Sequence, residues 1–282
     1  MLDYKPMVIE RRKWIGGLQN DSPYLNPWMP VLPTGATGQD VAAAMHATMK
    51  EHDISLELNT EAVAVHRQGQ DIFRIETASE EFAGRFLVIA SGVRAAPGGL
   101  HAATNVLIGP GQQIAAGSFQ GRHIAILGGG DDAFENYLFI RQRGVTSVTI
   151  FARALRARSE FLKQAPPEDI HIGECRVREE AATVNGRKYD SLIVLYGWEA
   201  CLPYMESCHV AINDRGFVVT GEKCETSQPG IYAIGEVAQR THPCCITSMA
   251  DGVVAAKEIQ WKLEQNSVAR FVGISKGGAG ES

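Results

Sequence analysis

A glycine loop in the middle of the chain has the residue types and spacing of a dinucleotide-phosphate site. The apolar run Ile124–Leu127 is followed by GGGDDA, which fits the pattern G-x-G-x-x-A with Gly128, Gly130 and Ala133 at the small positions. The first small residue permits a tight turn, the second lets the backbone approach a pyrophosphate, and the third lets a helix pack on a strand. Phosphates then accept hydrogen bonds from the N–H groups at the start of that helix.

Three further residues, Gly129, Asp131 and Asp132, complete this candidate loop. The sequence therefore predicts a nucleotide-binding strand, turn and helix. The alternative interpretation is a glycine-rich turn that is kept only because it lets the strand and the helix pack.

Basic side chains follow the next predicted strand. A site for NAD would place a carboxylate there, whereas this chain has Arg153, Arg156 and Arg158. A guanidinium binds a phosphate through two parallel hydrogen bonds, which suits the 2′-phosphate of NADP. We therefore expect NADP rather than NAD, and the alternative is that these arginines form a solvated surface.

An acidic residue near the N-terminus has the place of a ribose ligand in a second unit of the same kind. Met7–Glu10 resembles the second strand of such a unit, and Glu10 closes it. No strand and glycine loop precede it in this sequence. The alternative is that Glu10 is an ordinary charged residue at the end of a strand.

Two adjacent cysteines, Cys244 and Cys245, follow His242 and Pro243. One interpretation makes them redox-active thiols, with His242 stabilising a thiolate. The other treats them as small apolar residues, because adjacent cysteines pair only when their peptide bond is distorted. The six cysteines lack the spacing of a zinc site or a disulfide scaffold, so we expect no metal and a reducing, cytoplasmic setting.

Composition limits the class of protein. The chain has 282 residues, 45% apolar and 21% charged residues, and a net charge of −5. This length allows two domains, and neither the total charge nor any basic run favours a nucleic acid or membrane partner. No apolar stretch reaches the roughly 18 residues of a membrane span.

The elements that must position these residues alternate along the chain. The patterns predict one helix over 40–51 and another over 247–263, and a disordered tail from Gly273 to Ser282. We expect a crossing linker over 105–120. Strands are predicted at 7–10, 85–90, 124–127, 191–195, 217–220 and 230–234, and an antiparallel meander is predicted from 55–58, 62–67 and 71–77.

Five segments occur in a fixed order: Glu10, Gly16-Gly17-Leu18, Ile89-Ala90-Ser91-Gly92, GGGDDA and the GIYAIGEV that ends at Val237. This order resembles the thioredoxin reductase-like flavoproteins, from Pro6 to about Leu263. The resemblance implies an α/β fold of two doubly wound, Rossmann-like nucleotide-binding domains, one inserted in the other. An FAD-type domain would comprise 1–112 and 204–282, and an NAD(P)H-type domain 113–203.

The resemblance also implies which residues contact the flavin nucleotide. It places the helix that starts near Thr247 with its N-terminus towards the flavin ring. The candidate contacts are Glu10, Gly17, Gln19, Val63, Ser91, Gly92, Gly235, Glu236, Cys245 and Ile246.

The chain departs from the family pattern in three ways. The strand and glycine loop expected before Met7 are missing, and the catalytic CxxC is replaced within Gly111–Gly117. Glu236 stands where the family has Asp, and Cys244 stands about where it has a polar flavin contact. Since a dithiol is what passes electrons to thioredoxin by exchange, we do not expect a dithiol-type thioredoxin reductase.

The resulting prediction is an enzyme that passes a hydride from NADPH to FAD and on to a small molecule or a redox protein, as a homodimer. The alternative is a degenerate dinucleotide-binding or regulatory protein that has lost tight FAD binding. Three explanations of the missing segment remain open: a start site placed too far downstream, a loop supplied by another polypeptide, or a real loss. A parallel sheet without its central strand would expose unpaired backbone and apolar surface, which favours the first.

Overall fold

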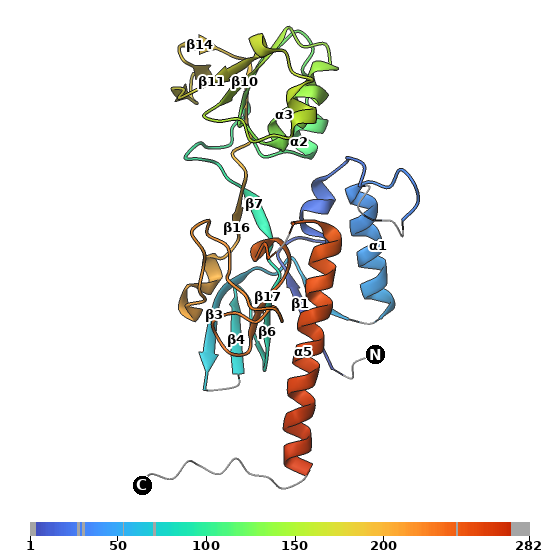
Figure 1. Cartoon of the computed structure of the whole chain (residues 1–282). Helices are drawn as coiled ribbons and strands as arrows, with labels where there is room; N and C mark the ends of the chain where they lie inside the picture. The colour runs from blue at the N-terminus through green and yellow to red at the C-terminus, as the bar shows by residue number, and fades with distance from the viewer. Residues whose placement is uncertain are drawn as a thin grey trace.

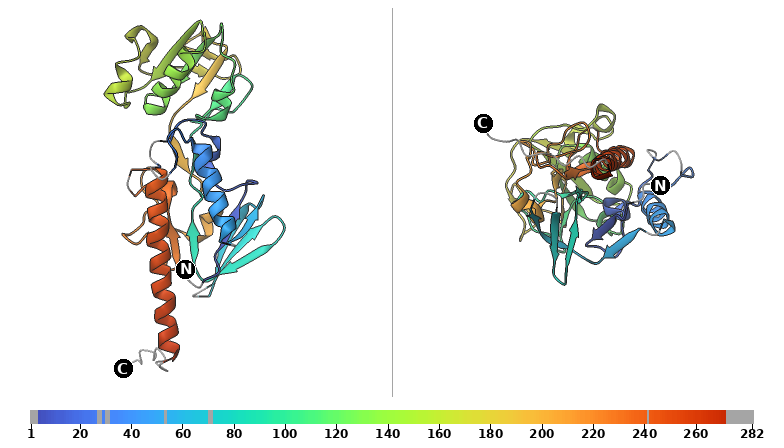
Figure 2. Two further views of the ribbon diagram at one scale, coloured as in Figure 1. Left: turned by 90° about the vertical axis from the view of Figure 1, so that its right-hand side faces the viewer. Right: turned by 90° about the horizontal axis from the view of Figure 1, so that it is seen from below.

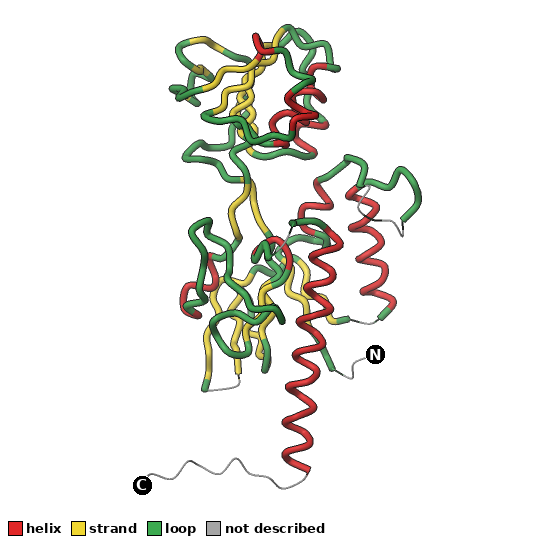
Figure 3. The backbone as a smooth tube through the Cα atoms, in the orientation of Figure 1, coloured by secondary structure: helices red, strands yellow, loops and turns green. Residues whose placement is uncertain are grey.

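Two lobes joined by a narrow waist make up the computed structural model (Figure 1), which describes residues 4–26, 29, 32–52, 54–69, 72–240 and 242–271. The waist is an antiparallel ribbon of β7 (Val93–Ala95) and β16 (Trp198–Ala200), in which Arg94 lies opposite Glu199. Figure 3 shows these two strands as the extended segments between the lobes. Because the chain crosses the waist twice, the upper lobe is an insertion in the lower one. The inserted upper lobe is called the inner lobe, and the lower lobe is called the outer lobe.

The inserted lobe is built on a parallel sheet with the strand order β11-β10-β9-β15-β8. Its central strand β9 is apolar and its four residues Ile124–Leu127 are fully buried, as expected for a parallel strand covered on both faces. The strands are β8 (Val106–Ile108), β9 (His123–Leu127), β10 (Ser147–Ala152), β11 (Ile170–Ile172) and β15 (Ser191–Val194).

Short helices and a small hairpin sheet complete this lobe. Helix α3 (Asp131–Arg141) packs Phe134, Tyr137 and Ile140 into its core. The other elements are α2 (Gln112–Ala115), α4 (Ser159–Leu162), the 3-10 turn η2 (Pro167–Asp169), and the antiparallel strands β12 (Val177–Arg178), β13 (Thr183–Val184) and β14 (Arg187–Lys188).

The outer lobe contains two separate parallel strand pairs. β1 (Met7–Glu10) pairs with β2 (Ser55–Leu58), and β6 (Leu87–Ile89) pairs with β17 (Ile231–Ala233). An antiparallel sheet of β3 (Ala62–Gln68), β4 (Ile72–Thr77) and β5 (Glu81–Gly84) lies between them in sequence.

The inner lobe provides a template for the outer one. In both lobes a parallel pair is followed by a three-stranded antiparallel sheet and then by a second parallel pair, so β10-β11 matches β1-β2 and β15-β8 matches β6-β17. In the inner lobe β9 joins the two pairs. Among the described residues, no strand joins β1 to β6.

Two long helices cover the outer lobe, and Figure 2 shows them from two further sides. α1 (Gly38–Glu51) begins at a capping box, in which Thr37 and Asp40 each bond the other's backbone N–H. α5 (Cys245–Phe271) extends beyond the sheets at its C-terminal end. Three 3-10 turns complete the lobe: η1 (Gly17–Asp21), η3 (Pro203–Cys208) and η4 (Gly235–Val237). No helix in the described ranges is long and apolar enough to cross a bilayer.

Several expectations from the sequence are corrected. The segment 55–58 is not part of the meander, because it pairs in parallel with β1, and the meander's third strand is β5. The expected linker 105–120 contains β8, which belongs to the inner sheet, so we propose that the inserted unit begins before residue 106 rather than at 113. Segment 217–220 forms only isolated bridges. The tail 273–282 lies outside the described residues.

Candidate functional site

The glycine loop of the inner lobe has one open side. A Cβ on Gly128 would lie 2.2 Å from the Leu195 carbonyl oxygen, and one on Gly129 would lie 2.2 Å from that of Ala154. A Cβ on Gly130 would meet nothing within 4 Å. The first two glycines are therefore needed for packing, whereas Gly130 leaves space beside the first turn of α3.

The start of α3 presents backbone N–H groups to this space. Gly130 is the N-cap residue and provides no side-chain hydrogen bond to the first turn. Ala133 is fully buried and packs in the core with β9. Since the first N–H groups of a helix have no partner within it, this end can bind an anion such as a phosphate.

The arginine loop after β10 folds over the glycine loop. The backbone N–H groups of Arg156 and Ala157 donate to the Gly129 carbonyl at 2.7 and 3.1 Å. Arg158 pairs through Nε with Asp131 at 2.7 Å, so this guanidinium already holds a carboxylate. Arg153 and Arg156 are exposed beside it and remain the better candidates for a 2′-phosphate.

A carboxyl group of one lobe acts electrostatically on a carboxyl group of the other. Asp132, in the first turn of α3, accepts a hydrogen bond at 3.1 Å from the indole Nε1 of Trp198 in β16. Burial, and after it the charge of Asp132, raise the pKa of Glu236 in η4. Burial also raises the pKa of Asp132, against the lowering effect of the Trp198 hydrogen bond. The charge of the predicted loop residue Asp132 therefore reaches the predicted flavin contact Glu236 in the other lobe.

The N-terminus of α5 adjoins the same junction. Burial works against ionisation of Cys244, but hydrogen bonds from the Thr247 hydroxyl and from the backbone N–H groups of Thr247 and Ile246 outweigh it, so the pKa of Cys244 is lowered. Burial instead raises the pKa of Cys245. The negative charge of Glu236 also acts on both thiols and works against their ionisation.

A polar chain connects the N-terminal loop to this helix. The amide nitrogen of Asn26 donates to Gln19 Oε1 at 3.0 Å and to Cys245 Sγ at 3.4 Å. Gln19 and Cys245 are thus brought together through a residue that the sequence did not single out. His242 is exposed, and its backbone carbonyl accepts from the Thr247 hydroxyl at 2.8 Å.

Glu10 lies at the opposite end of this loop region. Its Oε1 accepts from the backbone N–H of Arg12 at 2.8 Å, while Arg12 pairs with Asp21 at 2.8 Å and also donates to the Gly17 carbonyl at 3.4 Å. The carboxylate keeps a second oxygen for a ligand. This geometry is compatible with a ribose ligand and equally with an acid that closes a strand.

The remaining predicted residues have structural contacts of their own. Ser91 donates to the Cys201 carbonyl at 2.7 Å and the Gly92 carbonyl accepts from Cys201 at 3.2 Å, which holds the start of the waist ribbon. Gly235 donates to Asp251 at 3.1 Å. Two more candidates, Val63 and Ile246, are 54% and 39% exposed on β3 and α5.

The structure adds residues that the patterns missed. Trp198, Asn26 and Asp251 all contact predicted residues. Only Trp198 had a signal, since it comes shortly after the buried strand β15, and ligand-binding residues of parallel sheets gather beyond the carboxyl ends of the strands.

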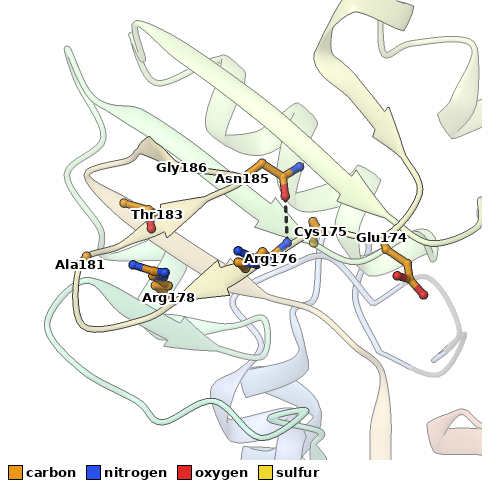
Figure 4. Close-up of a pocket in the computed structure, with 8 residues that line it drawn as sticks. All are labelled: Glu174, Cys175, Arg176, Arg178, Ala181, Thr183, Asn185 and Gly186. Carbon is orange, nitrogen blue, oxygen red and sulfur yellow. Dashed lines mark hydrogen bonds between the residues drawn. The ribbon is translucent and has the colours of Figure 1, made fainter.

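A broad concavity lies on the inner lobe (Figure 4). Its volume is about 940 Å³, and it is lined by residues of the hairpin sheet and of the segment before it, including Cys175, Arg176, Arg178 and Asn185. None of the predicted site residues lines it. Among the described residues, no three metal-binding side chains gather as a possible ion site.

The chain belongs to the pyridine nucleotide-disulphide oxidoreductase family, whose model matches residues 111–258. It is 26% identical over 221 residues to a thioredoxin reductase of Bacillus subtilis, which covers 70% of this chain and 69% of that one. It is 24% identical over 277 residues to ferredoxin–NADP reductase 2 of Cupriavidus necator, covering 86% and 73%. The protein is therefore an oxidoreductase of the flavin and pyridine-nucleotide type.

Solved structures support the fold. The thioredoxin reductase of Lactococcus lactis superposes with a TM-score of 0.73 at 21% identity, over 92% of this chain and 91% of that one. The bacillithiol disulfide reductase of Bacillus cereus gives a TM-score of 0.74 at 15% identity, over 93% of each chain. The two Rossmann-like units predicted from the sequence are thus confirmed.

Proposed function

We propose that this protein takes a hydride from NADPH, stores its electrons on FAD, and passes them to a small molecule or a redox protein without a dithiol. The observation that carries this proposal is the junction at the waist. There the charge of Asp132, in the first turn of α3 beside the open side of Gly130, acts on Glu236, and the charge of Glu236 acts on the thiol of Cys244 before α5.

The residues of the inner lobe fit NADPH. The space beside Gly130 and the first turn of α3 fits a pyrophosphate, and exposed Arg153 and Arg156 fit a 2′-phosphate. Bound there, the nicotinamide supplies a hydride, and flavin can accept it and release electrons singly or in pairs. The chain's own part is to orient the coenzyme through the glycine loop and to exclude water at the waist.

The residues of the outer lobe fit a flavin nucleotide in part. The Glu10 carboxylate, the N-terminus of α5 and Glu236 have the positions that the family resemblance assigns to flavin contacts. The half-buried Glu236 has a raised pKa, caused mainly by burial, and a protonated carboxyl there could donate a hydrogen bond. The two strand pairs of this lobe are not joined within the described ranges.

The choice of acceptor follows from the cysteines. α2, which occupies Gln112–Ala115, contains no cysteine, and all six cysteines of the chain are unpaired. Thiol exchange with a thioredoxin needs two cooperating thiols, so we propose a small-molecule or iron–sulfur acceptor over a disulfide. We also propose a homodimer in the cytoplasm, by likeness to the family.

The second candidate function is a dinucleotide-binding protein without turnover. The observation that favours it is the unjoined outer sheet, because a flavin nucleotide bound there would have fewer backbone contacts than a nucleotide bound in the inner lobe.

One experiment separates the two functions. The purified chain is incubated with FAD, freed of unbound flavin, and titrated anaerobically with NADPH while the visible flavin band is recorded. The enzyme predicts retained flavin that bleaches with NADPH and recovers on addition of ferricyanide or a quinone but not of oxidised thioredoxin. Protein that binds NADPH but retains no flavin supports the binding protein, and recovery with thioredoxin contradicts the proposed acceptor.

A further inference from the structure

We propose that Asp132 must take up a proton when the nucleotide binds, so that this carboxyl group sets the pH range in which the inner site is filled. The inference rests on the proposed function, because it assumes that nucleotide phosphates bind at Gly130 and the first turn of α3. Three observations support the inference: the position of Asp132 at the start of α3, the lack of a positively charged partner for its carboxylate, and the acidic groups around this carboxylate.

Asp132 occupies the end of α3 that a phosphate needs. It is the second residue of the helix, and its carboxylate reaches towards the waist, where Oδ2 accepts from Trp198 at 3.1 Å. A pyrophosphate bound to the same N–H groups would bring further negative charge close to this carboxylate. Two like charges in a partly buried site repel each other more strongly than they do in water.

The neighbouring acid shows the contrast. Asp131 is neutralised by Arg158, whose Nε lies 2.7 Å from it. Asp132 has only the uncharged indole as its side-chain donor, and within the described part of the chain no ion pair includes it. Removing a charge from Asp132 therefore removes repulsion without breaking a salt bridge.

The groups that face Asp132 are mostly acidic. On its own helix lie Asp131, whose charge acts on Asp132, and Glu135; from η4 comes Glu236. Burial and then the charge of Asp132 raise the pKa of Glu135 and of Glu236. The Arg158 guanidinium favours ionisation of Glu135, so it partly opposes this effect.

Two further titratable groups stand on the far side of Glu135. Burial, then the charge of Glu135, raise the pKa of Tyr24 in the N-terminal loop, and Arg143 acts in the opposite direction. Tyr24 also donates at 3.4 Å to Asn136, whose amide donates at 2.7 Å to the Asp132 carbonyl. The junction therefore has more negative than positive groups. Protonation of Asp132 lowers the electrostatic repulsion there most when the negatively charged nucleotide binds.

The reaction is a balanced binding equilibrium. Nucleotide, one proton and the site with ionised Asp132 give the complex in which Asp132 is neutral, and no electron moves. Affinity is then highest at low pH and falls as the pH rises through the range in which Asp132 ionises.

The test measures NADPH binding by calorimetry from about pH 5 to about pH 8.5, the range in which a carboxyl group with a raised pKa titrates. Each measurement is made in two buffers of different ionisation enthalpy, so that proton uptake can be determined. The wild type should take up a proton on binding and bind roughly tenfold more weakly at the high end. Asp132→Asn should bind at the high end about as tightly as the wild type at the low end, with less proton uptake. Asparagine retains an oxygen for Trp198, so this variant keeps the hydrogen bond.

Two further variants control the result. Glu180→Gln removes an equal charge from the exposed turn of the hairpin sheet and should follow the wild type. Trp198→Phe removes a donor that favours the ionised carboxylate, so the midpoint of the pH profile should move upwards.

The outcomes distinguish the two proposals. Binding with the same pH profile and proton uptake in the wild type and in Asp132→Asn overturns the role of Asp132 while leaving the nucleotide site standing. A downward shift in Trp198→Phe also overturns it. If the wild type binds no NADPH at any pH in the range, the proposed function fails and the inference fails with it. The 2′-phosphate titrates too, but equally in every variant.

Discussion

At the scale of single residues, the three consecutive glycines of the inner loop are not equivalent. Gly128 and Gly129 are buried against carbonyl oxygens of Leu195 and Ala154, whereas Gly130 faces open space. The sequence pattern assigned the close approach to a ligand to Gly130, and this assignment stays a prediction, for which the open space leaves room. Packing explains Gly129, which the pattern treats as unspecified.

This difference predicts a matched pair of variants. Gly129→Ala should lower the free energy of unfolding by about 1–3 kcal/mol, because its Cβ meets backbone that must move. Gly130→Ala should leave thermal stability nearly unchanged and weaken NADPH binding instead. Thermal melting and NADPH titration of both variants check this, and equal melting temperatures for the two would contradict the geometry.

The arginines make a second prediction at the residue scale. Arg153→Ala and Arg156→Ala should each weaken NADPH binding by roughly tenfold, the size of one charge-assisted hydrogen bond, and leave NADH binding unchanged. Arg158 should contribute less, because it already pairs with Asp131. Dissociation constants for both coenzymes test this, with Lys188→Ala as the control. Equal losses for NADH and NADPH would show that the arginines do not contact the 2′-phosphate.

At the scale of elements, the end of β17 is fixed to α5 by one ionic contact. Asp251 of α5 pairs with Arg240 at 2.7 Å and accepts from the backbone of Gly235 at 3.1 Å, and the two charged side chains are only 11% and 22% exposed. This contact orients η4, which carries Glu236. The position of that carboxyl group thus depends on a pair that the sequence pattern did not indicate.

Breaking the pair should destabilise the outer lobe. Arg240→Ala leaves the Asp251 carboxylate largely buried without its cation, and we expect a loss of about 3 kcal/mol of unfolding free energy. Lys257→Ala, an exposed change on the same helix, should alter it by less than about 0.5 kcal/mol. Denaturant unfolding measures both. A loss in Arg240→Ala no larger than in the control would mean that Asp251 finds water instead.

The extents of several short strands were predicted well from local patterns, although the sheet to which 55–58 belongs was not. Met7–Glu10, Ser55–Leu58 and Ile124–Leu127 appear as strands within one residue of the expected ends. β8 was missed because three residues between glycine-rich turns give no measurable period, and its strand character comes from pairing with β15. The ribbon β7-β16 was missed because its two strands lie about a hundred residues apart in the sequence.

The candidate site was predictable only in its parts. The glycine loop and the acid after GIYAIG each carry a local pattern. The effect of the Asp132 charge on Glu236 does not, because it joins residues of two lobes that are far apart in the sequence. The hydrogen bond from Trp198 was equally hidden, since it joins the waist to a helix 66 residues earlier in the chain.

At the scale of the whole molecule, the two lobes differ in how fully their sheets are paired. β9 and β15 each have a strand on both sides, whereas in the described ranges β1, β2, β6 and β17 each have one parallel neighbour. Strands with an unpaired edge open more readily, because fewer hydrogen bonds and less buried area hold them.

Hydrogen exchange should therefore separate the lobes. We expect the amides of 124–127 and 192–194 to exchange far more slowly than those of 7–10 and 87–89 under native conditions. Addition of FAD should slow exchange in the outer strands if the flavin site forms, and NADPH should slow it in the glycine loop. Equal protection of both lobes without ligand would show that the outer pairs are held by contacts other than sheet pairing.

The double crossing of the waist also has a consequence for the order in which the protein is made. All strands of the inner sheet have been synthesised once the chain reaches residue 194. They can therefore pair while the rest of the chain is still being made. β6 is made early, but its partner β17 arrives only after the whole inserted lobe. The nascent chain therefore holds an apolar strand without its partner for about half of its synthesis, and in that interval the outer half is the part most in need of a chaperone.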